Sequence, residues 1–182
     1  MSAGTTVRRA VDSPVGPILL GADGSGRLTS LRFGPMTGTG TGAEPESGAG
    51  AGAGAGAGSG TARAAAGVLD LAAVQLGEYF DGRRREFDLP LSLAGTPFQL
   101  AVWHALLRVG FGTTVSYGRV AEEVGRPGAA RAVGHANARN PVAVIVPCHR
   151  VVGAGGSLTG YGGGLEAKGL LLDLEARVVA SP

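Results

Sequence analysis

Residues 1–33 alternate short apolar segments with turn residues. Apolar segments occupy 17–20 and 28–33, and Asp, Ser, Pro and Gly gather at 12–14 and 23–26. Short apolar runs bounded by such residues are typical of β-hairpins, because these residues adopt the backbone angles that tight turns require. The pattern predicts two or three antiparallel strands between Thr5 and Phe33.

A glycine-rich tract separates these strands from the next ordered element. Thr-Gly and Ala-Gly repeats fill residues 37–60. The tract offers almost no side chain to bury, and glycine raises the entropy cost of ordering, so we expect a disordered expansion of a surface loop. Order should resume near Thr61 with a helix that ends before Asp81. Its apolar face is expected to contain Val68, Leu71, Val74, Leu76, Tyr79 and Phe80.

The second half of the chain has the spacing of several helices. Thr96 and Pro97 combine a side-chain cap with proline at the first helical position, and apolar residues follow at helical spacing. Ser116 can cap a helix over 117–124, and a Gly-Arg-Pro-Gly turn at 125–128 leads to another over about 129–139. Helix, short turn and helix are the outline of a helix-turn-helix.

Two further elements follow. The β-branched run 142–146 indicates a buried strand or extended segment that leads into a tight turn, and a leucine-rich helix is expected over about 165–178. Together the elements predict an α/β fold of the α+β type: a small antiparallel sheet with a helix, then a mostly helical, winged-helix-like part that contains the helix-turn-helix. We expect two domains, 1–92 and 93–182.

Composition narrows the functional classes. With 44% hydrophobic residues the chain can bury a core, and no apolar run is long enough to span a membrane, so we expect a cytoplasmic protein. The single cysteine excludes an internal disulfide, and the three histidines have no zinc-site spacing, so no metal is expected. A net charge of +2 permits an anionic partner without demanding one.

The single cysteine, Cys148, has neighbours that suit a working thiolate. Proline precedes it, His149 and Arg150 follow, and glycine-rich stretches at 153–156 and 160–164 leave room for a flat ligand. Alone, such a cysteine would more often be an inert core residue, and His149 a packed, hydrogen-bonded one. On an extended segment adjacent side chains point to opposite sides, so we expect His149 to reach the sulfur through one water.

An imidazole relay needs a third group to hold its tautomer. Glu175 is the candidate, because it lies on the terminal helix among leucines, where a charge needs a partner; its alternative interpretation is ordinary helix surface. The expected helix 129–139 is rich in Ala and Gly, including Ala130 and Gly134, so its backbone could approach DNA closely. Equally, those small residues could pack against a neighbouring helix, with Arg131 a solvated charge.

The motifs of this sequence resemble the O6-alkylguanine-DNA alkyltransferase family. The resemblance is close over about residues 66–177, whereas residues 1–35 are similar only in length and strand pattern. It rests on Pro147-Cys148-His149-Arg150-Val151-Val152, Pro97-Phe98-Gln99 with Val102-Trp103, Thr114-Val115-Ser116-Tyr117, Ala130-Arg131-Ala132-Val133-Gly134, Asn140-Pro141, and Gly160-Tyr161-Gly162-Gly163 before Lys168.

The resemblance implies a suicide DNA-repair protein that moves a methyl or other alkyl group from O6 of guanine, and possibly O4 of thymine, to Cys148. It implies a ribonuclease-H-like N-terminal domain, no cofactor, double-stranded DNA with alkylated guanine as partner, and a monomer. Base flipping from the minor groove would use Arg131 as the residue that fills the hole. The other implied roles belong to His149 and Glu175 (proton relay), Asn140 (support), Tyr117 (flipping and leaving group), and Ala130, Gly134, Tyr161, Gly162, Gly163 and Lys168 (substrate or DNA contact).

Three rival functions stay open from the residues. A damage-flagging protein of related fold would lack the cysteine, which Cys148 argues against. A hydrolase could use Cys148 and His149 as a thiol-base pair, and a transcription factor could use the helix-turn-helix alone. Neither of these two explains the whole set of motifs.

Overall fold

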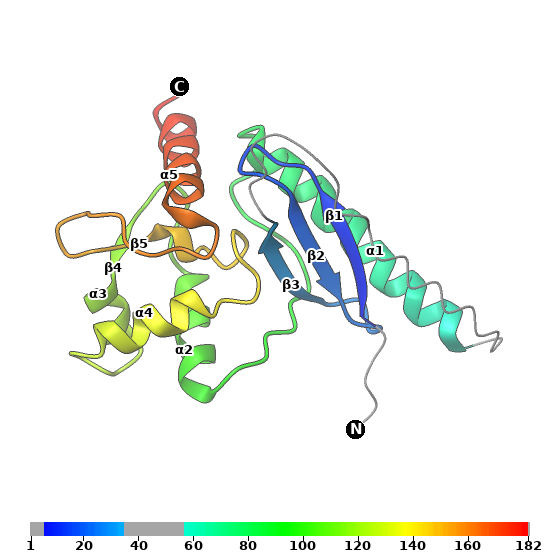
Figure 1. The fold of residues 1–182 in the computed structure, drawn as a ribbon, viewed down its shortest axis with the longest axis horizontal. Helices are drawn as coiled ribbons and strands as arrows, with labels where there is room; N and C mark the ends of the chain where they lie inside the picture. The colour runs from blue at the N-terminus through cyan, green and yellow to red at the C-terminus, as the bar shows by residue number, and fades with distance from the viewer. Residues whose placement is uncertain (1–5, 35–56, 182) are drawn as a thin grey trace.

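The computed structural model describes residues 6–34 and 57–181, and its N-terminal part begins with a three-stranded antiparallel sheet (Figure 1). The strands β1 (Val7–Val11), β2 (Ile18–Ala22) and β3 (Leu28–Phe33) lie in that order. Asp23 closes the second hairpin, because its carboxylate accepts hydrogen bonds from the backbone of Ser25 and Arg27. The predicted antiparallel strands are confirmed, and they number three among the described residues.

Helix α1 (Ala57–Phe80) packs along one face of this sheet (Figure 1). It begins within the tract predicted to be disordered, so the predicted restart near Thr61 is too late; residues 37–56 lie outside the described residues. The predicted apolar face is partly wrong, since Leu71 and Val74 are 44% and 58% exposed. The buried face instead follows Ala65, Val68, Leu69, Ala72, Leu76 and Tyr79.

The C-terminal part is mainly helical. It contains α2 (Pro97–Leu106), α3 (Tyr117–Glu123), α4 (Ala130–Ala138) and α5 (Gly164–Ala180). The caps expected from sequence are both confirmed. The Thr96 side chain accepts from the Gln99 backbone in a full capping box, and the Ser116 hydroxyl accepts from the Arg119 backbone. No helix in the described part of the chain is long and apolar enough to cross a membrane.

Helices α3 and α4 form the predicted helix-turn-helix. The turn contains Gly125 and Gly128 at φ values of 70° and 85°, where side chains are disfavoured. Beside it, β4 (Val115–Ser116) pairs in parallel with β5 (Val151–Val152), a two-stranded ladder that the sequence pattern did not predict. This ladder ties the start of α3 to the residues that follow Cys148.

The segment 142–146 is buried, as expected, but it is a turn rather than a strand. Val144 has a φ of 68°, an outlier for a β-branched residue, and the backbone of Val146 bonds back to that of Val142. The turn lies against the edge of β3. Leu31 donates to the Pro141 carbonyl and accepts from Ala143, so the two parts of the molecule meet at this point.

Candidate active site

Cys148 begins a single 3-10 turn, Cys148–Arg150, directly after the buried turn. Its side chain is 3% exposed, and its backbone N–H donates to the Val146 carbonyl. The Asn137 amide of α4 donates to the carbonyl of Cys148 at 3.2 Å. The predicted extended conformation at Cys148 is therefore wrong: local hydrogen bonds and a bond from α4 hold its backbone in a turn.

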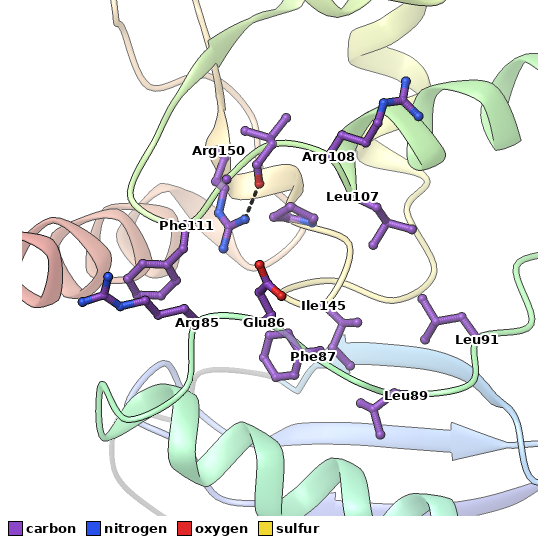
Figure 2. Close-up of a pocket in the computed structure, with 13 residues that line it drawn as sticks. Arg85, Glu86, Phe87, Leu89, Leu91, Leu107, Arg108, Phe111, Ile145 and Arg150 are labelled. Atoms are coloured by element: carbon purple, nitrogen blue, oxygen red, sulfur yellow. Dashed lines mark hydrogen bonds between the residues drawn. The ribbon is translucent and has the colours of Figure 1, made fainter.

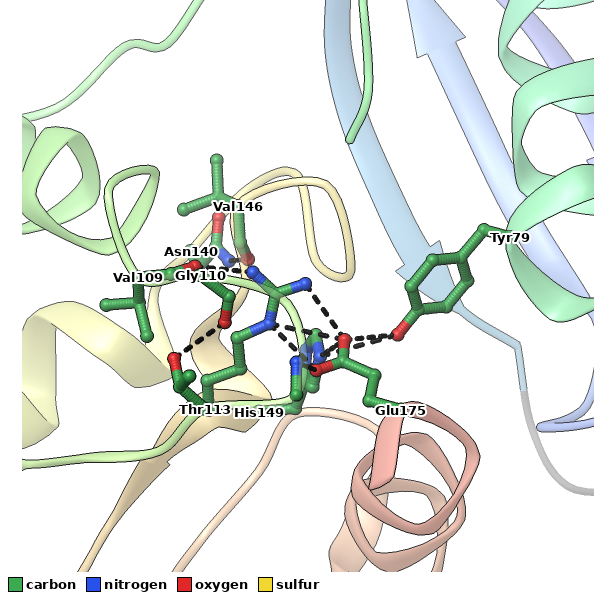
Figure 3. A network of polar contacts seen from close by, with 10 residues as sticks. Tyr79, Val109, Gly110, Thr113, Asn140, Val146, His149 and Glu175 are labelled. Carbon is green, nitrogen blue, oxygen red and sulfur yellow. Dashed lines mark hydrogen bonds and ion pairs between the residues drawn. The ribbon is translucent and has the colours of Figure 1, made fainter. Parts of the chain in front are cut away.

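His149, next along this turn, is fully buried and meets Glu175 of α5 (Figure 3). The His149 Nε2 lies 2.9 Å from Glu175 Oε1, and the two side chains are both inaccessible to solvent. Within the described part of the chain, His149 Nδ1 has no hydrogen-bond partner. With Nε2 bonded to the carboxylate, Nδ1 is the ring nitrogen left to accept a proton.

Glu175 is surrounded by donors from other elements. Arg150 donates from Nη2 to Oε1 at 2.9 Å and from Nε to Oε2 at 3.0 Å, and the backbone N–H of Gly112 donates to Oε2 at 2.9 Å. Tyr79 of α1 donates its hydroxyl to Oε1 at 2.7 Å (Figure 3). The carboxylate is thus held by charged and neutral donors, as a buried anion requires.

These contacts set the charge states at the site. Burial raises the pKa of Glu175, but hydrogen bonds from His149 and Arg150 outweigh it and hold the pKa at about 2. Burial lowers the pKa of His149 below its usual value, although Glu175 acts in the opposite direction. The site therefore pairs a neutral imidazole with an ionised carboxylate at neutral pH.

The thiol itself is shielded from water. Burial raises the pKa of Cys148 to about 11, while the side chains of Asn140 and Tyr161 and the positive charge of Lys168 act to lower it. The thiol is thus protonated at rest, and forming the nucleophilic thiolate requires a base at hand. His149 is the neutral base that the structure places next to it in the chain.

Asn140 braces the turn that precedes Cys148. Its Oδ1 accepts from the Val142 backbone at 3.0 Å, and its Nδ2 donates to the Val146 carbonyl at 2.8 Å. These two bonds span the turn that contains Val144. They offset the cost of the unusual backbone angle, which is of order 1–3 kcal/mol.

A cavity of about 600 Å³ lies between α4 and the glycine-rich loop that follows β5. Cys148 does not line it, but Tyr161, which affects the thiol pKa, does. The Tyr117 hydroxyl accepts from Thr159 at 2.9 Å at this cavity. Six of the residues predicted from sequence gather here: Tyr117, Ala130, Arg131, Gly134, Tyr161 and Gly162.

Three predicted positions have distinct settings. Arg131 on α4 is exposed and makes no hydrogen bond or ion pair within the described residues. Lys168 is fully buried, and its Nζ donates to the carbonyls of Val151 at 2.6 Å and Thr159 at 2.9 Å. Gly163 does not line the cavity; a Cβ there would meet the Phe33 ring at 2.6 Å.

Sequence reasoning missed three polar groups at the site. Tyr79 was assigned only to an apolar helix face, Asn137 was not singled out, and Arg150 was noted only as a neighbour of the cysteine. For Arg150 the sequence did contain a signal. It lies in the cysteine motif, and a buried carboxylate such as that of Glu175 needs a cation to pair with. The contacts of Tyr79 and Asn137 depend on the tertiary fold.

A second cavity, of about 420 Å³, lies beside the residues that flank Cys148 (Figure 2). Ile145 and Pro147 of the turn line it, together with residues of the segment that follows α1. The guanidinium of Arg150 lies 5.7 Å from the centre of the Phe111 ring there and donates to the Val109 carbonyl. Arg150, the partner of Glu175, lines this cavity, whereas Cys148 does not.

A buried thiol beside an acid-held imidazole, next to a helix-turn-helix, is typical of a DNA-binding protein with a cysteine nucleophile. The family description "6-O-methylguanine DNA methyltransferase, DNA binding domain" matches residues 97–177, and "6-O-methylguanine DNA methyltransferase, ribonuclease-like domain" matches residues 6–93. The chain belongs to the 6-O-methylguanine DNA methyltransferase family.

Named relatives agree with this assignment. The "Methylated-DNA--protein-cysteine methyltransferase" of Mycobacterium leprae is 49% identical over 171 residues, which cover 94% of this chain and 93% of the relative. The protein of the same name from Mycobacterium tuberculosis is 48% identical over 92% of this chain and 90% of its own length. A crystal structure of the M. tuberculosis protein in complex with DNA has a TM-score of 0.72 at 47% identity, covering 94% of this chain and 93% of that one.

Proposed function

We propose that this protein repairs DNA by transferring a methyl or other alkyl group from O6 of guanine to Cys148. The observation that carries the proposal is that the chain's single, buried thiol directly precedes His149, whose imidazole pairs with the buried Glu175 carboxylate. The family membership and the named relatives support the same activity. Double-stranded DNA is the partner, and alkylated guanine within it is the substrate.

The chemistry is a displacement at a saturated carbon. The proton of Cys148 passes to Nδ1 of His149, through one water, and Glu175 stabilises the imidazolium that forms. The thiolate attacks the alkyl carbon, the S–C bond forms and the C–O6 bond breaks. The departing guanine takes up a proton from the Tyr117 hydroxyl, and the proton that His149 received from Cys148 replaces it through solvent. The product is a thioether, which neither exchange nor hydrolysis reverses, so each molecule acts once and needs no cofactor.

The substrate base must leave the duplex to reach this site. Unstacking a base costs a few kcal/mol, and the exposed guanidinium of Arg131, which pairs with no group in residues 6–34 or 57–181, is available to fill the space that the base vacates. The cavity beside α4 has the size of a typical small-molecule site, so a guanine can enter it. Because the Tyr117 hydroxyl accepts from Thr159, its own hydrogen is free to donate to the departing base.

Several finer assignments complete the proposal. The residues that line this cavity, Ala130 and Gly134 on α4 with Tyr161 and Gly162 on the loop, contact the flipped nucleotide. Gly163 and Lys168 fix that loop, Asn140 braces the cysteine turn, and no metal takes part. The protein acts as a monomer in the cytoplasm, with a domain boundary between residues 92 and 93.

The decisive test mixes the protein with duplex DNA that carries one methyl-labelled O6-methylguanine. We expect label on the protein to rise to one equivalent per chain and then stop, with mass spectrometry locating it at Cys148. Cys148→Ala should bind the lesion without transfer. Continued turnover would favour a hydrolase, lesion binding without transfer by the natural protein would favour a damage flag, and sequence-specific binding of undamaged DNA would favour a regulator.

A second test addresses base flipping. Arg131→Ala should slow the repair of duplex DNA strongly while leaving the reaction with free O6-methylguanine base little changed, because the free base needs no extrusion. Arg83→Ala is the matched control, since Arg83 is also an exposed arginine but pairs with Asp81 beyond α1. Equal losses on both substrates for Arg131→Ala would contradict the flipping role.

A further inference from the structure

Tyr79 links the N-terminal part of the molecule to the proton relay. It lies in the last turn of α1 and is fully buried. Its hydroxyl donates to Glu175 Oε1 at 2.7 Å and lies 3.5 Å from His149 Nε2 (Figure 3). A side chain from the sheet-bearing part therefore touches the two groups that move the proton.

The position of this hydroxyl is fixed by ring packing. The Tyr79 ring lies 5.3 Å from Phe87, 5.4 Å from Phe80 and 5.9 Å from Phe111, measured between ring centroids. Edge-on and tilted contacts at these distances are favourable, and they surround the ring on several sides. A Tyr79→Phe change can keep this packing and remove only the hydroxyl.

Glu175 Oε1 accepts hydrogen bonds from three donors: Tyr79, His149 and Arg150. Each donor makes the carboxylate a weaker acceptor for the others. Removing one donor makes the carboxylate more basic, and a more basic carboxylate stabilises the imidazolium form of His149 more strongly.

We propose that Tyr79 is a positioning residue for alkyl transfer, whose hydroxyl holds Glu175 and limits how strongly that carboxylate stabilises protonated His149. The N-terminal part thereby completes the relay. This inference rests on the proposed alkyl transfer, and it names a determinant of its pH dependence that lies far from α4 in the sequence.

Other charged and titratable groups face the same pair. Arg150 bonds to Glu175 from the cysteine turn, and Lys168 on α5 disfavours protonation of His149. Tyr161 interacts with the Cys148 thiol, and its ring lies edge-on to the His149 ring at 6.4 Å between centroids. A Tyr79→Phe variant leaves these groups in place, so its effect on the imidazole isolates the hydroxyl.

The test compares natural protein and Tyr79→Phe in two measurements. In single-turnover transfer from duplex O6-methylguanine, we expect the acid limb of the pH–rate profile to move to higher pH by roughly half a unit or more, with the rate above that limb and the DNA affinity unchanged. An NMR titration of the His149 ring without DNA should show the same upward shift. An unmoved acid limb, or a rate lowered equally at all pH values, would overturn the proposal.

Gln75→Met is the matched control. Gln75 is a buried polar residue one turn earlier on α1, and it bonds to the backbone of Asp88 rather than to the relay. It should lower stability without moving the acid limb; a similar shift in this variant would assign the effect to packing and refute the role of the hydroxyl. If the natural protein transfers no methyl group, alkyl transfer itself fails, while the NMR titration still decides the role of Tyr79.

Discussion

Replacing Glu175 by glutamine removes the charge at the centre of the relay and keeps the size of the side chain. The carboxylate is fully buried and is the counterion of Arg150, which is itself 6% exposed. Breaking a buried ion pair by removing one partner typically costs about 3–5 kcal/mol, because the other charge stays buried. The amide also places an NH2 group at one of the two oxygen positions, where either Tyr79 (at Oε1) or Gly112 (at Oε2) already donates. We therefore expect a loss of about 3–5 kcal/mol in the free energy of unfolding at pH 7.

The pH dependence of stability gives a second figure for the free energy that the Glu175 carboxylate contributes to folding. The pKa of Glu175 is about 2 in the folded protein against a reference of 4.5, and at about 1.36 kcal/mol per unit this corresponds to about 3 kcal/mol. A lowered folded-state pKa means that the stabilisation is fully present above pH 4.5 and is lost as the pH falls through the folded pKa. The loss contributed by Glu175 thus develops between about pH 5 and pH 2.

Urea denaturation from pH 7 to pH 2 would measure both effects. The natural protein should lose about 3 kcal/mol more than Glu175→Gln over the acid range, because the other carboxylates titrate in both proteins. Glu166→Gln is the control, since Glu166 is exposed near the start of the same helix. Parallel stability curves for the natural protein and Glu175→Gln would refute the assignment of a depressed pKa to this carboxyl.

Two further substitutions test the surroundings of the thiol. Asn140→Ala leaves the Val142 N–H without its partner and removes one of two donors to the Val146 carbonyl, so it should cost about 1–3 kcal/mol, measured by urea denaturation. Val144→Gly, which relieves the positive φ, should recover part of that loss in the double variant. Gly163→Ala should cost about 1–3 kcal/mol by the same measurement, because its Cβ meets the Phe33 ring, whereas Gly162→Ala, with open space around it, should be near neutral.

The elements that the sequence predicted well are those specified locally. Thr96 with Pro97 and Ser116 with its following helix carry their own capping groups, so these starts could be read from a few residues. The pairing of His149 with Glu175 was also predictable, because a buried carboxylate near a leucine-rich face needs a partner.

The elements predicted wrongly depend on distant contacts. Valine and isoleucine at 142–146 favour a strand, yet the segment turns because Asn140 and the edge of β3 supply its hydrogen bonds. On α1, periodicity alone could not tell which apolar residues face the sheet, so Leu71 and Val74 were placed on the wrong face.

Three contacts make the N-terminal part a component of the active site rather than a separate neighbour. The edge of β3 at Leu31 pairs with the cysteine turn, Phe33 packs at 5.5 Å against Tyr161 of the cavity, and Tyr79 bonds to Glu175. Each contact reaches a different feature: the turn, the wall of the cavity beside α4, and the His149–Glu175 pair. Because the His149–Glu175 pair and the cysteine turn are buried and contact both parts, changes in how the parts dock must alter the thiol environment even where no residue of α4 changes.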